Sequence, residues 1–334
     1  SDENQISSIL FNIKTNAVGC DGISVSMLKM SSPDILPVMT HIINCCLLSC
    51  VFPEIWKTAN VIPLPKINEP KLFKDLRPIS ILPVMSKILE KIMVEQINKH
   101  ITLHNILPET QSGFRKGYSC ATALLNITDD ILSAADKNRT SILVMLDYSK
   151  AFDTISHQIL FSILRFIGFS VTAVELMPSY LTNRFQKVIL NGESSTSLPI
   201  IAGVPQGSNL GPLLYLLYTC NFRNHVKHCR YHLYADDTQL QIDFQPDNVA
   251  LANKLINSDI DALVNVSEKH CLKINAEKSV VMVFGQRKAR NLIKQDVDVK
   301  VADSGLLVKE TAKNLGLILD EGLKFSQHKY YFFI

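Results

Sequence analysis

Two acidic segments constrain the fold of this chain most, because each places carboxylates at the end of an apolar run. They are VMLDYSKAFD (residues 144–153) and LYADDTQL (residues 233–240). The run Ser-Ile-Leu-Val-Met-Leu before Asp147 is typical of a buried strand. Apolar and polar residues alternate on both sides of Asp236 and Asp237, which predicts a β-hairpin with the aspartates at its tip. A strand end and a hairpin tip can meet at the edge of one sheet.

These three aspartates predict a metal site. An isolated Asp-Asp pair is usually a hairpin turn or a helix cap, so the flanking strand pattern carries the argument. Adjacent carboxylates repel each other unless a cation lies between them. Asp147, Asp236 and Asp237 together could hold two divalent cations, the arrangement used for in-line transfer at phosphorus. The pattern therefore points to nucleotidyl transfer.

Nine segments, in order, resemble the reverse transcriptase of a non-LTR (LINE-type) retrotransposon, nearest the jockey-like and CR1-like branch. Those that resemble the four catalytic motifs are LDYSKAFDTISH (146–157), GVPQGSNLGPLL (203–214), YADD (234–237) and LKINAEKSVVMVFG (272–285). Four upstream segments resemble the family's finger motifs: VGCDGI (18–23), VIPLPK (61–66), LRPISILPVMSKILEKIM (76–93) and QSGFRKGYS (111–119). KNLGLILDEGLKFSQH (313–328) resembles the primer grip.

Strands mixed with helices, without strict βαβ alternation, predict an α+β fold with an antiparallel sheet backed by helices. The resemblance implies a right-hand polymerase with fingers and an N-terminal extension (1–140), a palm (141–328) and a truncated tail (329–334). The thumb is expected to be largely missing, as is the upstream endonuclease domain. Residue spacing predicts helices over 83–100, 121–135 and 158–166, and strands over 188–190, 198–204 and 279–284. The two strands 188–190 and 198–204 are expected to flank an Asn191-Gly192 turn.

The resemblance also implies roles for residues around the metals. Asp147 and Asp236 would bind two Mg²⁺ ions, or Mn²⁺ in their place, with Asp237 assisting and the backbone carbonyl of Tyr148 as a further ligand. By spacing alone Asp153 is a rival ligand, but the family pattern assigns the metal to Asp147. Lys278 resembles the lysine that protonates the leaving pyrophosphate.

Substrate contacts follow from the same resemblance. Phe152 would lie near the sugar and exclude a 2′-hydroxyl, which selects dNTP; the alternative is that Phe152 is only a core residue. Gln206 resembles the nucleotide-binding glutamine, between glycines that would let the backbone approach a ligand. Lys66 and Arg77 would clamp the triphosphate. Arg115 would contact the template.

Composition adds limits on partners and location. The 334 residues carry a net charge of only +3, so no global basic field indicates a polyanion partner. Residues 38–52 are too short and too polar to span a bilayer and predict a core helix. Eight cysteines without a CxxC pair favour a reducing, intracellular location, in cytoplasm or nucleus. A cluster of short Cys and His spacings matches no common zinc finger and is interpreted as incidental; its members are Cys220, His225, His228, Cys229 and His232.

The sequence therefore predicts an RNA-directed DNA polymerase, a magnesium-dependent nucleotidyltransferase that extends a DNA primer on an RNA template. The alternative is a decayed or repurposed retroelement fragment that folds and binds nucleic acid or protein without catalysis. Departures from the family pattern favour the alternative, among them Asn209, where relatives usually have an aliphatic residue, and Met177-Pro178. The intact aspartates favour the enzyme. The sequence leaves the oligomeric state open.

Overall fold

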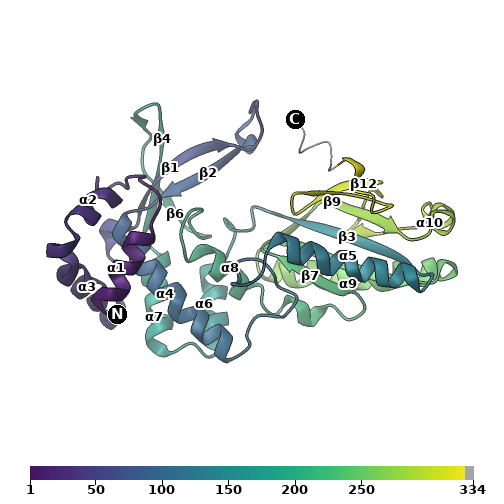
Figure 1. The fold of residues 1–334 in the computed structure, drawn as a ribbon, viewed down its shortest axis with the longest axis horizontal. Helices are drawn as coiled ribbons and strands as arrows, with labels where there is room; N and C mark the ends of the chain where they lie inside the picture. The colour runs from purple at the N-terminus through teal and green to yellow at the C-terminus, as the bar shows by residue number, and fades with distance from the viewer. Residues whose placement is uncertain (328–334) are drawn as a thin grey trace. The chain divides into compact units, whose positions relative to one another are not determined.

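The computed structural model describes residues 1–327, which form two compact units that are interleaved along the chain (Figure 1). The first unit contains Ser1–Ile106 and Phe152–Tyr218, and the second contains Leu107–Ala151 and the chain from Thr219 on. The predicted fingers and palm are contiguous ranges, so they do not coincide with these units, and their assignment stays a prediction. The expected tail, 329–334, lies outside the described residues.

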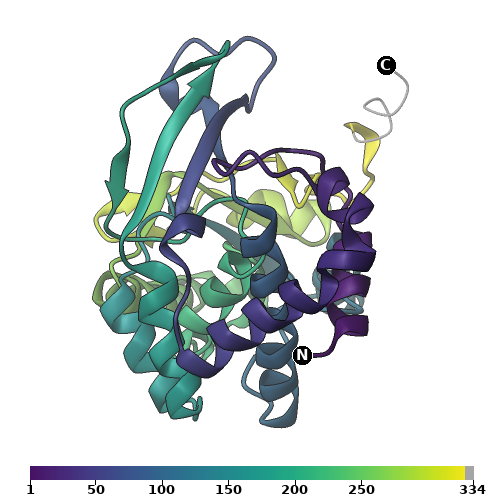
Figure 2. The same cartoon turned by 90° about the vertical axis from the view of Figure 1, so that its left-hand side faces the viewer.

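The first unit contains a mixed five-stranded sheet. Its strands are β1 (Thr58–Pro65), β2 (Leu76–Ile81), β4 (Arg184–Leu190), β5 (Glu193–Ser194) and β6 (Leu198–Ile200). The order is β2-β1-β4-β5, with β6 also paired to β4; β1 and β4 are parallel, and the long strands stand together in Figure 2. The Asn191-Gly192 turn leads into the short β5. The predicted strand 198–204 ends early because Gly203 has φ +80° and donates its N–H to Ile155.

The first unit also contains seven α-helices, which pack chiefly on one another. They are α1 (Glu3–Asn12), α2 (Val25–Met30), α3 (Ser32–Ser49), α4 (Val84–Leu103), α6 (His157–Phe166), α7 (Val171–Leu181) and α8 (Gly211–Tyr218), with 3₁₀ turns at Glu54–Trp56 and Phe73–Asp75. The helices predicted over 83–100 and 158–166 are confirmed. The predicted core helix, α3, buries only one face: Met39 and Ile43 are buried, whereas Val38 and Ile42 are exposed. Among the helices of residues 1–327, none has the length and apolar character that crossing a bilayer requires.

The second unit contains an antiparallel four-stranded sheet in the order β7-β8-β3-β9. Its strands are β7 (Arg230–Tyr234), β8 (Asp237–Phe244), β3 (Thr140–Ser149) and β9 (Lys273–Phe284). The buried strand before Asp147 and the hairpin at Asp236 and Asp237 are therefore confirmed. Strand β9 begins at Lys273, well before the predicted 279, because the chain returns to pair with β3 beyond an irregularity near Asp147.

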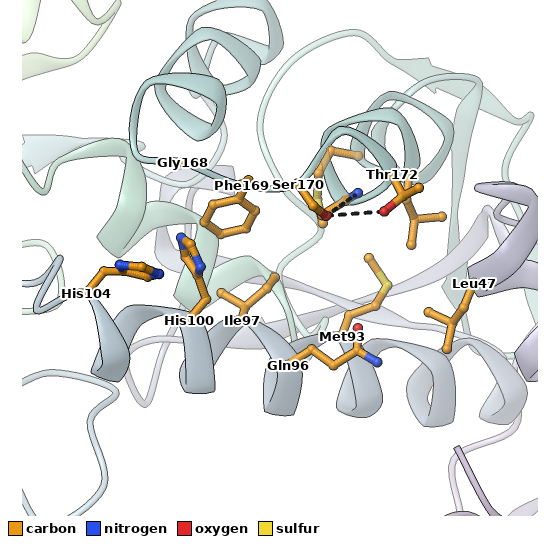
Figure 3. A pocket seen from close by; sticks show the side chains of 13 residues that line it. Leu47, Met93, Gln96, Ile97, His100, His104, Gly168, Phe169, Ser170 and Thr172 are labelled. Atoms are coloured by element: carbon orange, nitrogen blue, oxygen red, sulfur yellow. Dashed lines mark hydrogen bonds between the residues drawn. The ribbon is translucent and has the colours of Figure 1, made fainter.

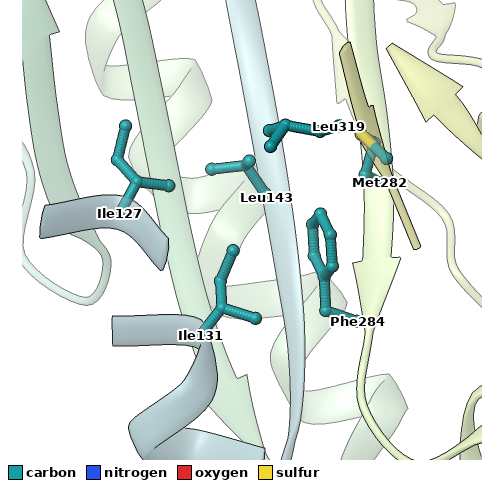
Figure 4. Packing of buried hydrophobic residues seen from close by; sticks show 6 residues of the cluster. All are labelled: Ile127, Ile131, Leu143, Met282, Phe284 and Leu319. Atoms are coloured by element: carbon teal, nitrogen blue, oxygen red, sulfur yellow. The ribbon is translucent and has the colours of Figure 1, made fainter. Parts of the chain in front are cut away.

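Both faces of this sheet are covered, and its core is apolar. Helix α5 (Cys120–Asp136), predicted over 121–135, and β13 (Leu317–Asp320) pack on one face (Figure 4), where the buried cluster is Ile127, Ile131, Leu143, Met282, Phe284 and Leu319. Helix α9 (Val249–Lys269) packs against β8 and β9. The remaining elements are the 3₁₀ turns Phe222–His225 and Pro246–Asn248, α10 (Arg287–Ile293), and the strands β10 (Lys300–Val301), β11 (Ser304–Gly305) and β12 (Thr311–Asn314). The fold is thus mixed α+β, as predicted.

Candidate active site

Three aspartates meet at one end of the sheet in the second unit. The last residue pair between β3 and β8 is Leu146 with Thr238, so Asp147 and Asp237 lie directly beyond it on neighbouring strands. Tyr234 pairs with Asp237, which leaves Asp236 in the two-residue turn that joins β7 to β8. Strands β3 and β8 are buried along most of their length because both faces of the sheet are covered, and the backbone ladder between them pairs seven residues without interruption. The structure therefore brings together the three carboxylates that the sequence singled out.

Each of these carboxyl groups has a raised pKa. Burial is the main cause for Asp147 and Asp236, and the charge of Asp147 adds to the shift at Asp236. The pKa of Asp237 rises to about 6, first through loss of hydration and then through Asp236 and Asp147, although the residue is exposed as a whole. The ionised trio is therefore unfavourable without a compensating cation.

The oxygen atoms at this end of the sheet fit a hard divalent cation. Oδ2 of Asp147 is buried and accepts no hydrogen bond; the nearest cation is Nζ of Lys278, at 3.9 Å. Carboxylate oxygens are the ligands that Mg²⁺ and Mn²⁺ prefer. Within residues 1–327, however, no group of three or more His, Cys, Asp or Glu side chains has an arrangement that could hold a metal ion as it stands. The binding of two metal ions by these aspartates therefore stays a prediction.

A β-bulge in β9 surrounds Asp147. On β9, Asn275 lies opposite Asp147 and Val280 opposite Met145, so the intervening residues, including Lys278, bulge from the ladder. Ser279 closes the bulge, because its Oγ accepts the Asp147 N–H at 3.2 Å and donates to the Asn275 carbonyl at 2.7 Å. Bulges next to active sites re-aim side chains. Sequence reasoning identified Lys278 but missed Ser279, for which no local signal exists.

Tyr148 anchors the same strand to the helix behind it. Its buried hydroxyl lies 3.1 Å from Oγ of Ser267 on α9, and burial raises its pKa to about 12. The side chain is therefore structural. The predicted metal contact through the Tyr148 backbone carbonyl stays a prediction.

In the first unit, Gln206 and Asp153 form one polar cluster. Nε2 of Gln206 donates to Oδ1 of Asp153 at 2.9 Å, and the Gln206 carbonyl accepts the N–H of Ser80 at 2.6 Å. Asp153, the rival metal ligand by spacing, thus contacts the glutamine amide. Phe152, half-buried, stacks at 4.9 Å between ring centroids on the buried Tyr215. Phe152 therefore has the packing of a core residue on one side.

The glycines of GVPQG serve contacts between chain segments. A Cβ at Gly203 would lie 2.6 Å from the Asp153 carbonyl oxygen, and one at Gly207, which has φ +118°, would lie 2.5 Å from that of Ser80. The sequence predicted a close approach to a ligand. The approach that the structure shows is to neighbouring backbone.

Two of the residues predicted to contact phosphate or template, Lys66 and Arg115, already form hydrogen bonds with backbone carbonyls of the chain itself. Lys66 and Arg77 lie near each other on the exposed β1–β2 hairpin, where Nζ of Lys66 donates to the Lys74 carbonyl at 2.9 Å. Arg115, in the second unit, donates from Nη1 to the carbonyls of Pro108 (2.9 Å) and Gln111 (3.1 Å). The Arg115 guanidinium therefore stabilises its own loop, and its template contact stays a prediction.

A buried aspartate that the sequence did not single out supports the hairpin that carries Asp236 and Asp237. Asp259, on α9, accepts the backbone N–H groups of Lys227, His228 and Cys229 at 2.9, 2.8 and 2.7 Å. These residues lead directly into β7. The Cys and His residues of this loop form no metal-binding group within the described chain, and Asp259 accounts for the loop's structure.

The first unit also contains a cavity of about 380 Å³ between α4 and α7 (Figure 3). Its lining is mainly apolar, with His100 and His104 at one end, and His100 also lies 3.1 Å from the Ile167 carbonyl. None of the predicted site residues lines it.

Comparison with known proteins identifies the class. The family described as reverse transcriptase (RNA-dependent DNA polymerase) matches residues 64–319, more than half of the chain. This range contains all three aspartates and Gln206. The chain belongs to the reverse transcriptase family.

The individual relatives are RNA-directed DNA polymerases of mobile elements. The chain is 30% identical over 322 residues to the probable RNA-directed DNA polymerase from transposon BS of Drosophila melanogaster. It is 28% identical to the RNA-directed DNA polymerase from mobile element jockey and 27% identical to the probable one from transposon X-element, both of the same fly. Each match covers 93% of this chain and 34% of the relative, so the chain spans about a third of the relatives' length. The predicted relation to jockey-like non-LTR retrotransposon reverse transcriptases is confirmed.

Proposed function

We propose that this chain contains the catalytic core of an RNA-directed DNA polymerase that adds dNTPs to the 3′-hydroxyl of a DNA primer on an RNA template. The observation that carries the proposal is the meeting of Asp147, Asp236 and Asp237, all with raised pKa, at one sheet end in a reverse transcriptase. Such a cluster is unfavourable by itself and favourable around divalent cations.

Asp147 and Asp236 would hold two Mg²⁺ ions, with Asp237 and the Tyr148 carbonyl assisting. Cations bound there would supply the positive charge that lowers the pKa of an attacking hydroxyl and offsets negative charge on a leaving pyrophosphate. Ser279 keeps Asp147 oriented by accepting its backbone N–H. Lys278 offsets the charge of Asp147 before substrate binds and is the candidate proton donor to pyrophosphate.

Residues of the first unit would select and hold the nucleotide. Gln206, fixed by Asp153 and Ser80, presents a rigid amide for the sugar and the template base. Phe152, braced against Tyr215, would exclude a 2′-hydroxyl. Lys66 and Arg77 would bind the triphosphate, and Arg115 would contact the template. The partners in this proposal are an RNA template, a DNA primer and dNTPs. The proposed location is inside the cell.

Primer extension on poly(rA)/oligo(dT) tests the proposal. The purified chain should incorporate dTTP only when Mg²⁺ or Mn²⁺ is present. Asp236→Asn should reduce incorporation by at least about a thousandfold, because it removes a metal ligand and its charge. The exposed Asp261→Asn is the matched control and should retain full activity. A folded chain that forms no product with either metal would instead favour the decayed, non-catalytic alternative.

A further inference from the structure

The turn that carries Asp236 has a strained backbone. Ala235 has φ +58°, a left-handed conformation that a residue with a Cβ rarely adopts. It occupies the first position of the two-residue turn between Tyr234 and Asp237, where hairpins usually place glycine. Some other part of the protein must therefore hold this turn in shape.

A buried glutamine contacts the strained residue. Oε1 of Gln111, which is 2% exposed, accepts the N–H of Ala235 at 3.2 Å and that of Gly113 at 2.8 Å. One side-chain oxygen thus joins two segments that are 124 residues apart in the sequence. The Gln111 amide has no charge, so it satisfies the turn without adding to the repulsion among the aspartates.

The segment around Gln111 is itself fixed against β7. Leu233 donates its N–H to the Thr110 carbonyl at 3.0 Å, and Ser112 donates to the Leu233 carbonyl at 2.8 Å. Gln111 and Leu233 form a parallel bridge. The glutamine therefore projects from a short strand-like edge whose register on the hairpin is set by backbone hydrogen bonds.

Gly113 permits this close packing. A Cβ built at Gly113 would overlap the backbone nitrogen of Ala235 and lie 2.9 Å from its Cα. Both neighbours are backbone atoms, which cannot rotate away. Only glycine fits here, although its φ is not left-handed.

We infer that Gln111 is a positioning residue, which holds the Ala235–Asp236 turn so that the aspartates keep their geometry, and that Gly113 makes room for it. The catalytic meaning of this inference rests on the proposed function. The hydrogen bond itself does not, so the two can fail separately.

A matched pair of variants tests the bond. Gln111→Met has nearly the same length but lacks an acceptor oxygen, whereas Gln111→Glu keeps the acceptor. Hydrogen exchange of the full chain, measured by mass spectrometry on peptides that contain Ala235, should be about five- to tenfold faster in Gln111→Met, the effect of losing one neutral hydrogen bond. Gln111→Glu should restore the protection. Equal exchange in wild type and Gln111→Met, at equal Tm, would overturn the inference.

Metal binding and kinetics test the positioning role. Gln111→Met should weaken Mn²⁺ binding, followed by electron paramagnetic resonance, by about tenfold, and lower kcat while the KM for dTTP stays unchanged. In an Ala235→Gly background, where glycine adopts the turn without strain, the same substitution should have a smaller effect.

If Gln111→Met exchanges faster but binds Mn²⁺ like the wild type, Gln111 is only structural and the positioning role is refuted. A wild-type chain that extends no primer refutes the proposed function, and the exchange and Mn²⁺ measurements still decide the role of Gln111.

Discussion

Replacing Asp237 with asparagine is expected to stabilise the metal-free protein at pH 7.5. The pKa of Asp237 is raised from 3.8 to about 6 in the folded protein, so its ionised form opposes folding. A shift of that size corresponds to about 3 kcal/mol. Because Asp237 is exposed, water screens much of this effect, and we expect a gain of about 1 kcal/mol. A gain of this size raises Tm by about 1–2 °C in a chain of 334 residues, because the entropy of unfolding grows with chain length.

The gain should depend on pH in a defined direction. The folded protein holds the Asp237 proton more tightly than the unfolded chain does, so wild-type stability falls as pH rises from about 4 to about 6. Asparagine has no proton to lose. The stability difference between Asp237→Asn and wild type should therefore be complete above about pH 6 and shrink as pH falls towards 4.

Thermal unfolding followed by circular dichroism checks this reasoning. Both proteins are scanned between pH 4 and pH 8 in EDTA, with Asp261→Asn as an exposed control that should show no pH-dependent difference. Adding Mn²⁺ at pH 7.5 should raise the Tm of the wild type and raise that of Asp237→Asn by less, because the variant keeps Asp147 and Asp236 but loses an assisting ligand. The reasoning is refuted if Asp237→Asn unfolds at a lower temperature in EDTA, or if its gain is the same at pH 4 and pH 7.5.

Three further substitutions test the supports of the site. Asp259→Ala should destabilise the protein by about 2–4 kcal/mol in urea unfolding, because three backbone N–H groups lose a charged acceptor, whereas Asp261→Ala on the same helix should have little effect. Leu143→Ala should cost about 3 kcal/mol in the same assay, since this side chain is fully buried in the sheet core. Phe152→Val should reduce the preference for dTTP over UTP in primer extension by roughly tenfold or more; lower stability with unchanged preference would show that Phe152 is only a core residue.

The sequence predicted those parts of the fold that local periodicity encodes. Alternation around the Asp236–Asp237 pair and the apolar run before Asp147 gave the hairpin and the central strand, and helical spacing gave α4, α5 and α6 within a few residues. Boundaries shifted where a single backbone contact decides them, as at Gly203, which leaves the strand to bond with Ile155. The interleaving of the two units was not predictable, because no linker composition marks where the chain crosses between them.

The three aspartates of the candidate site could be singled out from their own neighbourhood, whereas the residues that support them could not. The aspartates stand out because doubled charge beside a strand has few structural uses. Gln111, Ser279 and Asp259 act through hydrogen bonds to backbone groups 124, 132 and about 30 residues away, and nothing in their own neighbourhoods indicates those partners. Such residues can be recognised only once the register of the sheet is known.

Asn209 shows why a departure from the family pattern need not indicate decay. Its backbone N–H donates to the buried Glu90 at 2.6 Å, and its side-chain amide donates to the Lys87 carbonyl at 3.1 Å. An aliphatic residue at 209 would keep the first bond and lose the second. Because burial raises the pKa of Glu90, the N–H bond that the carboxyl group accepts matters for keeping it in place. Asn209 thus fastens the Gln206 loop to α4 with one bond more than an aliphatic residue could provide, so this departure has a structural use and is no argument for decay.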